Sequence, residues 1–229
     1  MRRIVFDIET CAYPFETLAE SQKEYLLRYA DKEPDPEKRQ MMIDDAVRYT
    51  SLYPYTSKCI VIGIYDVQKE KSFVYYESDK KEEWKSEDDK VLYKGLTEKE
   101  MLESFWRVAK VVDQIVTFNG RNFDVPFLMM RSAMLGVKVS RNLMGYRYGD
   151  EHIDLLEQFT FYGATRKFNL DFYCQSFGIE SPKSKDISGM EVKNLYEAGR
   201  IKDIAVYCSK DIFATYQLFK IWQEYLNLK

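Results

Sequence analysis

Residues 3–10 read Arg-Ile-Val-Phe-Asp-Ile-Glu-Thr, an apolar stretch typical of the first strand of a buried sheet. Successive side chains of a strand alternate between faces, so Asp7 and Glu9 share one face and lie roughly 7 Å apart. Both are close enough to contact one pair of metal ions. Taking carboxylates out of water costs several kcal/mol each unless they are paired or bound to metal. This strand end is therefore either exposed or occupied by cations.

The composition is that of an ordinary soluble globular protein. The chain has 229 residues, 45% hydrophobic and 31% charged, which suffices for one domain with a buried core. No apolar run approaches the ~20 residues that span a bilayer, and no signal peptide is visible. The cysteines are widely scattered, at Cys11, Cys59, Cys174 and Cys208. This spacing indicates neither a zinc site nor a disulfide scaffold, so a reducing, cytoplasmic location is the default.

The net charge of −3 argues against a protein that coats nucleic acid by bulk electrostatics. Residues 1–120 carry 19 Lys and Arg against 24 Asp and Glu, whereas residues 121–229 carry 15 against 13. The second half is compatible with a modest basic groove. A substrate that is held by one end, largely through metal ions, needs no broad basic surface.

The strand pattern indicates a mixed sheet. Residues 59–67 and 72–76 predict a hairpin, and residues 114–118 a further apolar strand. Residues 77–94 are densely charged without a period, which predicts an exposed loop.

Helical segments separate and flank these strands. Residues 11–58 predict two helices broken at residues 33–36, and Thr97 with Glu100 forms a capping box that opens another helix. The alternation of strands and helices without a Pro- or Gly-rich linker predicts one α/β domain over residues 1–229, with insertions at about 11–58 and 77–96.

A third acid follows the strand at residues 114–118. Pro126 and the apolar run that ends at Gly136 predict a helix that begins near Asp124. Asp is a favoured helix N-cap, so a purely structural role competes with a ligand role. The two roles are compatible, because ligands of α/β proteins gather at such strand-to-helix junctions.

The last predicted helix runs from residue 201 to about 226 and carries a fourth acid. Asp211 falls on or beside its apolar stripe, where a charge needs a partner. Tyr207 lies one turn before it on the same face. A salt bridge or hydrogen bond for Asp211, and simple packing for Tyr207, are the structural alternatives.

Together these pieces resemble the DEDD superfamily of 3′-to-5′ exonucleases, which has a ribonuclease H-like fold. Three motifs occur in the expected order: Phe6-Asp-Ile-Glu-Thr10, Asn119 with Phe123-Asp124, and Tyr207-Cys-Ser-Lys-Asp211. A Tyr four residues before the last Asp is typical of the tyrosine subclass (DEDDy). The resemblance extends over nearly the whole chain and is closest to stand-alone exonucleases similar to the proofreading domain of family B DNA polymerases.

The resemblance implies a ribonuclease H-like, mixed five-stranded sheet flanked by helices, with a helical insertion after the first strand. It implies a metal-dependent exonuclease that removes nucleoside 5′-monophosphates from the 3′ end of single-stranded DNA, using two Mg²⁺ or Mn²⁺ ions. The implied metal ligands are Asp7, Glu9, Asp124 and Asp211. Tyr207 would orient the attacking water.

Further roles follow from the same resemblance. Thr10, Asn119 and Phe123 would hold the terminal nucleotide, although Phe123 is equally explained as a core aromatic. Single-stranded 3′ ends are the expected partners, with association to replication or repair machinery and no membrane contact. Asp154 is a candidate for supporting the site, and a structural role is expected for His152. Candidate phosphate contacts, which surface position explains equally well, are Arg166, Lys167, Lys183 and Lys185.

Three alternatives remain open. An RNA 3′-to-5′ exonuclease would use the same chemistry. A catalytically silent nucleic-acid-binding module would tolerate the loss of its metal ligands. A two-metal phosphatase would cleave simple phosphomonoesters, which we do not expect of this protein.

Overall fold

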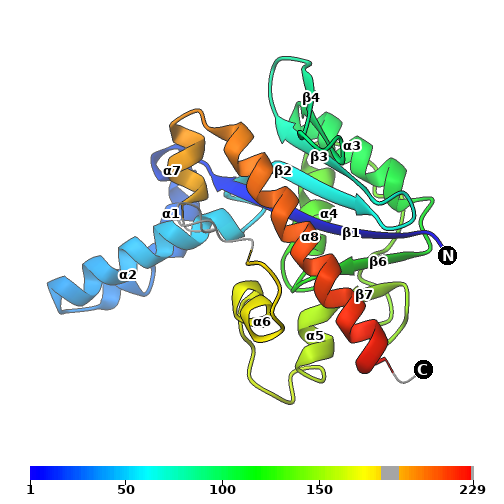
Figure 1. Cartoon of the computed structure of the whole chain (residues 1–229). Helices are drawn as coiled ribbons and strands as arrows, with labels where there is room; N and C mark the ends of the chain where they lie inside the picture. The colour runs from blue at the N-terminus through cyan, green and yellow to red at the C-terminus, as the bar shows by residue number, and fades with distance from the viewer. Residues whose placement is uncertain (182–190, 228–229) are drawn as a thin grey trace.

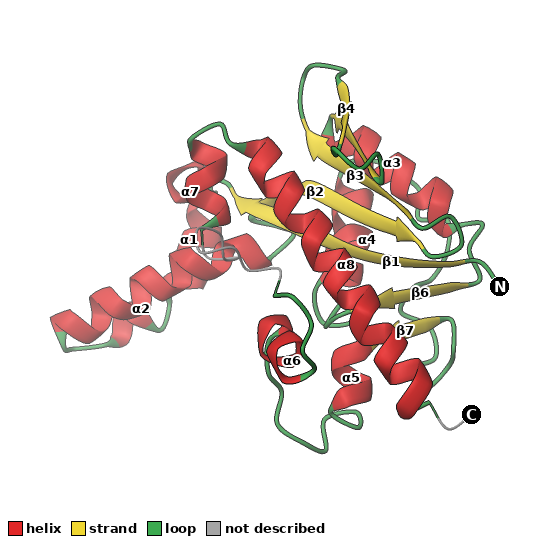
Figure 2. Cartoon of the chain, in the orientation of Figure 1, coloured by secondary structure: helices red, strands yellow, loops and turns green. Residues whose placement is uncertain are grey.

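The computed structural model describes residues 1–181 and 191–227, and its centre is a mixed sheet with helices on both faces (Figures 1 and 2). The strand order across the sheet is β4-β5-β3-β2-β1-β6-β7. The strands are β1 (Arg3–Ala12), β2 (Ser57–Asp66), β3 (Lys71–Glu77), β4 (Glu83–Lys85), β5 (Val91–Leu96), β6 (Gln114–Thr117) and β7 (His152–Asp154). The predicted opening strand, hairpin and apolar strand correspond to β1, β2 with β3, and β6.

Strand β1 lies near the middle of the sheet and pairs differently on its two sides. It runs antiparallel to β2 along most of its length, with Asp7 opposite Gly63. Its parallel pairing with β6 covers only residues 3–5. The second half of β1 therefore extends past the end of β6, and this edge is open to groups from the loop and helix that follow β6.

The two faces of β1 meet different helices, as the alternation predicts. Ile4, Phe6 and Ile8 pack in one apolar cluster with α3 (Glu98–Ala109) and α4 (Asp124–Met134). Helix α8 (Ile201–Tyr225) crosses the opposite face, where Val5 contacts a second cluster (Figure 1). Asp7 and Glu9 belong to this second face, so they lie beneath α8.

The helices agree well with the sequence. The capping box of Thr97 and Glu100 is present at the start of α3. Helix α4 begins at Asp124 itself, with Phe123 in the capping position, so the N-cap role considered for Asp124 is not the one observed. The remaining helices on the body of the fold are α5 (Leu155–Phe159), α6 (Leu170–Ser176) and α7 (Val192–Glu197).

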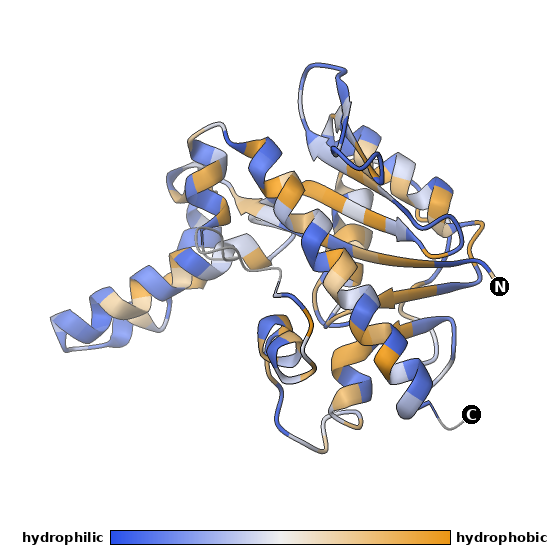
Figure 3. Ribbon diagram, in the orientation of Figure 1, coloured by the Kyte–Doolittle hydropathy of each residue, from blue (hydrophilic) through white to orange (hydrophobic). Residues whose placement is uncertain are grey.

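Residues 13–56, between β1 and β2, form a helical arm that projects from the sheet (Figure 1). It contains α1 (Glu20–Leu27) and α2 (Pro36–Tyr49), joined by the short 3-10 turns η1 (Phe15–Thr17), η2 (Ala30–Lys32) and η3 (Thr50–Leu52). Neither α1 nor α2 has a buried residue, and hydrophilic colours dominate α2 in Figure 3. The two predicted helices and the break before Pro36 are confirmed.

A buried arginine of α4 holds both ends of the arm. The Arg131 guanidinium donates to Glu98 on α3, to the hydroxyl of Tyr13 at 2.9 Å, and to the carbonyl of Pro54 at 3.2 Å. Tyr13 precedes the arm's first helix and Pro54 follows its last turn. The arm is thus fixed at its base, while its helices contribute nothing to the core.

The sheet has seven strands in the described residues, so the predicted five was wrong. The error arises at residues 77–94, which were expected to be an exposed loop but contain β4 and the start of β5. Trp84 stacks on Tyr93 with ring centroids 3.7 Å apart, and β5 pairs in parallel with β3. Charged residues flank Trp84 on both sides and follow Tyr93, which concealed the edge strand β4 and its neighbour β5.

In the described part of the chain, no helix combines the length and apolarity needed to cross a bilayer.

Candidate active site

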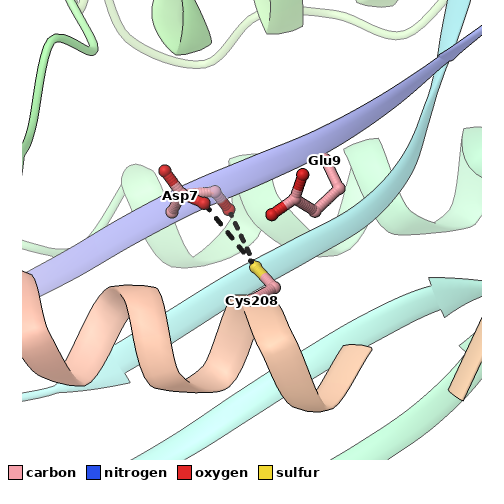
Figure 4. A group of neighbouring side chains, drawn as sticks. All are labelled: Asp7, Glu9 and Cys208. Carbon is pink, nitrogen blue, oxygen red and sulfur yellow. Dashed lines mark hydrogen bonds between the residues drawn. The ribbon is translucent and has the colours of Figure 1, made fainter. Parts of the chain in front are cut away.

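Among the described residues, two acids of β1 and one thiol of α8 form a close group of possible metal ligands. One ligand atom each from Asp7, Glu9 and Cys208 lie within 4.8 Å of one another, and Figure 4 shows these side chains meeting between β1 and α8. The Cys208 Sγ is 3.8 Å from the Asp7 carbonyl oxygen and 3.9 Å from its Oδ2. Glu9 is buried and Asp7 half-buried.

Asp124 reaches β1 from the first residue of α4. Its Oδ1 accepts a hydrogen bond from the backbone N–H of Ile8 at 3.0 Å. That N–H is available because β6 ends before this point of β1. The open edge of β1 thus fixes a third carboxylate, itself only 3% exposed, beside Asp7 and Glu9.

The loop that delivers Asp124 is held by a buried acid that caps the next helix. Asp154 accepts backbone hydrogen bonds from Asn119 at 2.8 Å, from Arg121 at 2.9 Å and from Leu156 at 3.0 Å. Asn119 adopts a left-handed φ of 65°, which the Asp154 contact stabilises. This geometry supports a positioning role for Asp154.

Helix α8 supplies Asp211, and Tyr207 one turn earlier; both side chains are buried. The helix approaches closely because residue 63, opposite Asp7, has no side chain. A Cβ there would lie 2.8 Å from the Cys208 Sγ and 3.2 Å from a methyl of Ile212. Glycine at this position is therefore what lets α8 reach the acids of β1.

The four acids disfavour one another's ionisation. Burial, followed by the charges of Asp124, Glu9 and Asp211, raises the pKa of Asp7 well above its usual range. Burial and the charges of Asp211 and Asp124 do the same to the pKa of Glu9. Burial raises the pKa of Asp124 to about 7, although its hydrogen bond from Ile8 opposes the change. The site is electrostatically incomplete without positive charge.

The donor set suits hard divalent cations. Carboxylate oxygens are the ligands that Mg²⁺ and Mn²⁺ prefer, and His152, the single histidine, lies outside this group. Burial and the neighbouring acids raise the pKa of Cys208, which disfavours the thiolate that softer metals require. Its thiol therefore packs against Asp7 as a neutral neighbour.

A cleft of about 670 Å³ opens onto the acids. Glu9, Tyr207 and Asp211 line it, together with Thr10 and Phe123. The Thr10 hydroxyl donates to the carbonyl of Ser51, which ties the cleft to η3 of the arm. The arm, α6 and α7 supply further walls, which include Arg48, Tyr49, Asn169 and Lys193.

Other candidate residues lie elsewhere. Asn119 is not among the residues that line the cleft, and its side-chain oxygen accepts from Asn122, so its nucleotide contact stays a prediction. Arg166 and Lys167 are exposed in the loop before α6, where the Arg166 guanidinium lies over the ring of Phe168. Lys183 and Lys185 fall outside the described residues.

His152 has the structural environment expected for it. Its Nδ1 is 3.1 Å from the Leu143 carbonyl, which can only accept, so Nδ1 carries the proton. Its Nε2 then accepts from the Thr117 hydroxyl at 2.8 Å. Burial lowers the pKa of His152 to about 4, so the ring is neutral at physiological pH.

Sequence reasoning missed three features of the site: Gly63, the contact of Cys208 with Asp7, and the wall supplied by the arm. The pairing of Asp7 with Gly63 depends on strand register, which one sequence does not reveal. Cys208 was identified only as one of the scattered cysteines and as part of the third motif, without any sign of a contact to Asp7. The Tyr-rich composition of residues 11–58 was the single available signal for the wall.

Comparison with known proteins agrees with this geometry. Residues 56–226 match the family described as "Predicted 3'-5' exonuclease related to the exonuclease domain of PolB". That span contains Asp124, Tyr207 and Asp211, while Asp7 and Glu9 precede it. The chain is 33% identical over 153 residues to the DNA polymerase of Desulfurococcus sp. (strain Tok), which is 60% of this chain and 20% of the polymerase. It is 32% identical over 153 residues to the DNA polymerase of Thermococcus gorgonarius, again 60% of this chain and 20% of the polymerase.

A solved structure shows the same fold. The family B DNA polymerase from the hyperthermophilic archaeon Pyrobaculum calidifontis superposes with a TM-score of 0.61 and 16% identity, covering 97% of this chain and 24% of the polymerase. The α/β architecture expected from the resemblance is therefore confirmed. The chain spans about a fifth of the length of the curated polymerases that it matches. Because the family match covers most of the chain, this protein belongs to the 3′-5′ exonucleases related to the exonuclease domain of family B DNA polymerases.

Proposed function

We propose that this protein removes nucleotides one at a time from the 3′ end of single-stranded DNA, as an exonuclease of the tyrosine subclass that uses two divalent metal ions. The observation that carries the proposal is the convergence of Asp7, Glu9, Asp124 and Asp211 from β1, α4 and α8, where each charge disfavours its neighbours. A cluster of mutually repelling acids lowers the stability of the metal-free fold. Its presence is explained if the acids serve to bind cations.

The four carboxylates would hold the ions. When bound, a pair of Mg²⁺ or Mn²⁺ ions supplies activation of the attacking water and charge stabilisation for the leaving 3′ oxygen. The chain's part is to hold the ligands rigidly. The N–H of Ile8 orients the Asp124 carboxylate, and the Cys208 thiol packs against Asp7.

Tyr207 would orient the attacking water through its hydroxyl. Burial, the charges of Asp211, Glu9 and Asp7, and a hydrogen bond to Asp211 all raise the pKa of Tyr207 above its ordinary value. The hydroxyl therefore keeps its proton at neutral pH and acts as a hydrogen-bonding group, not as a general base.

The cleft would take the terminal nucleotide. Phe123 lines it with its side chain half-buried, so its ring can contact a base while it also packs near Phe127. Stacking on an aromatic ring is tolerant of sequence, which suits an exonuclease. DNA is favoured because the relatives at 30% identity or more are DNA polymerases.

The test follows the shortening of 5′-labelled single strands of DNA and of matched RNA in Mg²⁺ and in Mn²⁺. We expect a ladder that shortens from the 3′ end on DNA. Asp7→Asn should slow it about 10³-fold, because a misplaced ion forfeits several kcal/mol of transition-state stabilisation. The control is Asp203→Asn, an exposed acid of α8 that pairs with Arg200. Unchanged activity of Asp7→Asn would overturn the mechanism, and faster RNA cleavage would overturn the choice of DNA.

A further inference from the structure

The helical arm carries an apolar groove that the proposed function does not use. The groove has a volume of about 740 Å³, and five of its lining residues are tyrosines: Tyr25, Tyr29, Tyr49, Tyr53 and Tyr55. Each of these side chains is between 42% and 65% exposed. So many exposed aromatic rings on one small surface indicate a binding site, since isolated domains seldom gather them without a partner.

The groove adjoins the cleft at one shared residue. Tyr49, at the end of α2, lines both cavities. Its neighbours Arg48 and Leu52 face the cleft, while Ala46 and Tyr53 face the groove. A strand that leaves the cleft past Tyr49 would therefore reach the groove.

The charges of the groove suit a polyanion. Residues 13–56 carry nine Asp and Glu against six Lys and Arg, so the arm as a whole does not attract one. The groove itself is lined by Arg28 and by no acid. The Arg28 guanidinium lies over the rings of Tyr25, at 3.7 Å, and Tyr29, at 4.5 Å. Arg48, which also pairs with Asp45 at 2.8 Å, lies over Tyr49 at 5.0 Å. Cations stacked on aromatic rings are a common pairing in single-strand binding sites.

We infer that the groove binds the unpaired nucleotides that lie upstream of the 3′ end, with their bases stacked on the arm tyrosines and their phosphates near Arg28 and Arg48. This inference rests on the proposed function, because the cleft must hold the strand's 3′ end for the upstream part to reach the arm. It assigns a purpose to α1 and α2, whose lack of buried residues is otherwise unexplained. The substrate class is then a single strand several nucleotides long, recognised without regard to sequence.

The test measures binding without hydrolysis. Labelled oligothymidylates of 4 and 16 nucleotides are titrated with the protein in Ca²⁺ and followed by fluorescence anisotropy. The wild type should bind the longer strand at least tenfold more tightly. In the double variant Tyr25→Ala, Tyr29→Ala, affinity for the longer strand should fall about 10- to 100-fold, so that both lengths bind alike. Alanine favours helix, α1 has no buried residue, and the side chain of Tyr29, which follows α1, is exposed, so the arm should keep its fold.

Two further variants make the result specific. Tyr25→Phe with Tyr29→Phe keeps the rings and should bind within twofold of the wild type. Tyr225→Ala removes a tyrosine that is equally exposed but lies at the end of α8, and should have no effect. A double alanine variant that still prefers the longer strand would overturn the inference, as would a wild type without length dependence. Shortening of the 16-mer in Mg²⁺ is assayed separately, so failure of the exonuclease proposal is distinguishable from failure of the groove.

Discussion

The carboxylate site and the helical arm border one cleft but are built in opposite ways. The site concentrates buried acids that raise one another's pKa, and it is held by β1, α4 and α8 at the centre of the fold. The arm buries no side chain of α1 or α2 and exposes aromatic rings instead. A rigid core is needed where charges must be forced together. A surface that only has to meet a ligand needs no such support.

Replacing Asp211 with Asn should have the largest effect and should separate activity from stability. Exonuclease activity should fall about 10³-fold, because a metal ligand is lost. The metal-free protein, however, should unfold at a higher temperature, by about 3 °C for each ~1 kcal/mol of repulsion removed. Nuclease assays and thermal melts in EDTA measure the two effects.

The sign of this stability change follows from the pKa directions. The folded-state pKa values of Asp7 and Glu9 lie above their unfolded values. Their protonation thus stabilises the metal-free fold below about pH 4, and this stability is lost as the pH rises through the raised values. Mg²⁺ should raise the melting temperature of the wild type at pH 8. A metal-free Asp211→Asn protein that melts lower than the wild type would contradict the repulsion.

Replacing His152 with Gln should change how stability depends on pH. The unfolded imidazole has a pKa of about 6.5, whereas the folded pKa is about 4. The free energy of unfolding of the wild type should therefore fall by up to about 3 kcal/mol as the pH drops from 6.5 to 4. Below pH 4 this histidine should cause no further loss. The loss should be absent from His152→Gln. Urea titrations at several pH values measure it, and equal slopes in both proteins would argue against a buried neutral histidine.

Replacing Gly63 with Ala should test how closely α8 must approach β1. The new methyl would meet the Cys208 Sγ at 2.8 Å, and overpacking of this kind costs about 1 to 3 kcal/mol. Adding Cys208→Ala should restore most of the stability, because the sulfur is what the methyl meets first. Gly145→Ala is the control, since a Cβ there meets only ordinary contact at 3.6 Å. Urea denaturation of the wild type, Gly63→Ala, Cys208→Ala and the double variant gives the coupling energy between the two sites, and additive effects would exclude such a coupling.

Removing one helix cap in the core and one in the arm should have the smallest effect on stability. It should also give the most direct contrast between the two regions. Thr97 caps α3 and Asp35 caps α2, each by accepting backbone N–H groups. Thr97→Ala should lower the free energy of global unfolding by about 1 kcal/mol. Asp35→Ala should leave it nearly unchanged and only speed amide hydrogen exchange in α2, because the arm can open without exposing core. Equal losses of global stability would show that the arm folds as part of the core.

Much of the fold could be predicted because its signals are local. The capping box before α3, the breaker before α2 and the apolar stripe of α8 each depend on residues close together in the chain. Strands β4 and β5 could not be recognised, because their stability comes from pairing with β3 and from the Trp84 and Tyr93 stack. Edge strands such as β4 carry many charged residues, so their composition resembles that of a loop.

The sequence by itself determined the chemistry: two acids on one face of a strand, an acid at a helix start, and an acid one turn after a tyrosine on the last helix. Only the tertiary structure decided their arrangement. The early end of β6 leaves the Ile8 N–H for Asp124, the register of β1 and β2 places Gly63 opposite Asp7, and the arm encloses the cleft. These features depend on strand register and helix packing between segments far apart in the chain, which residue identity alone does not specify.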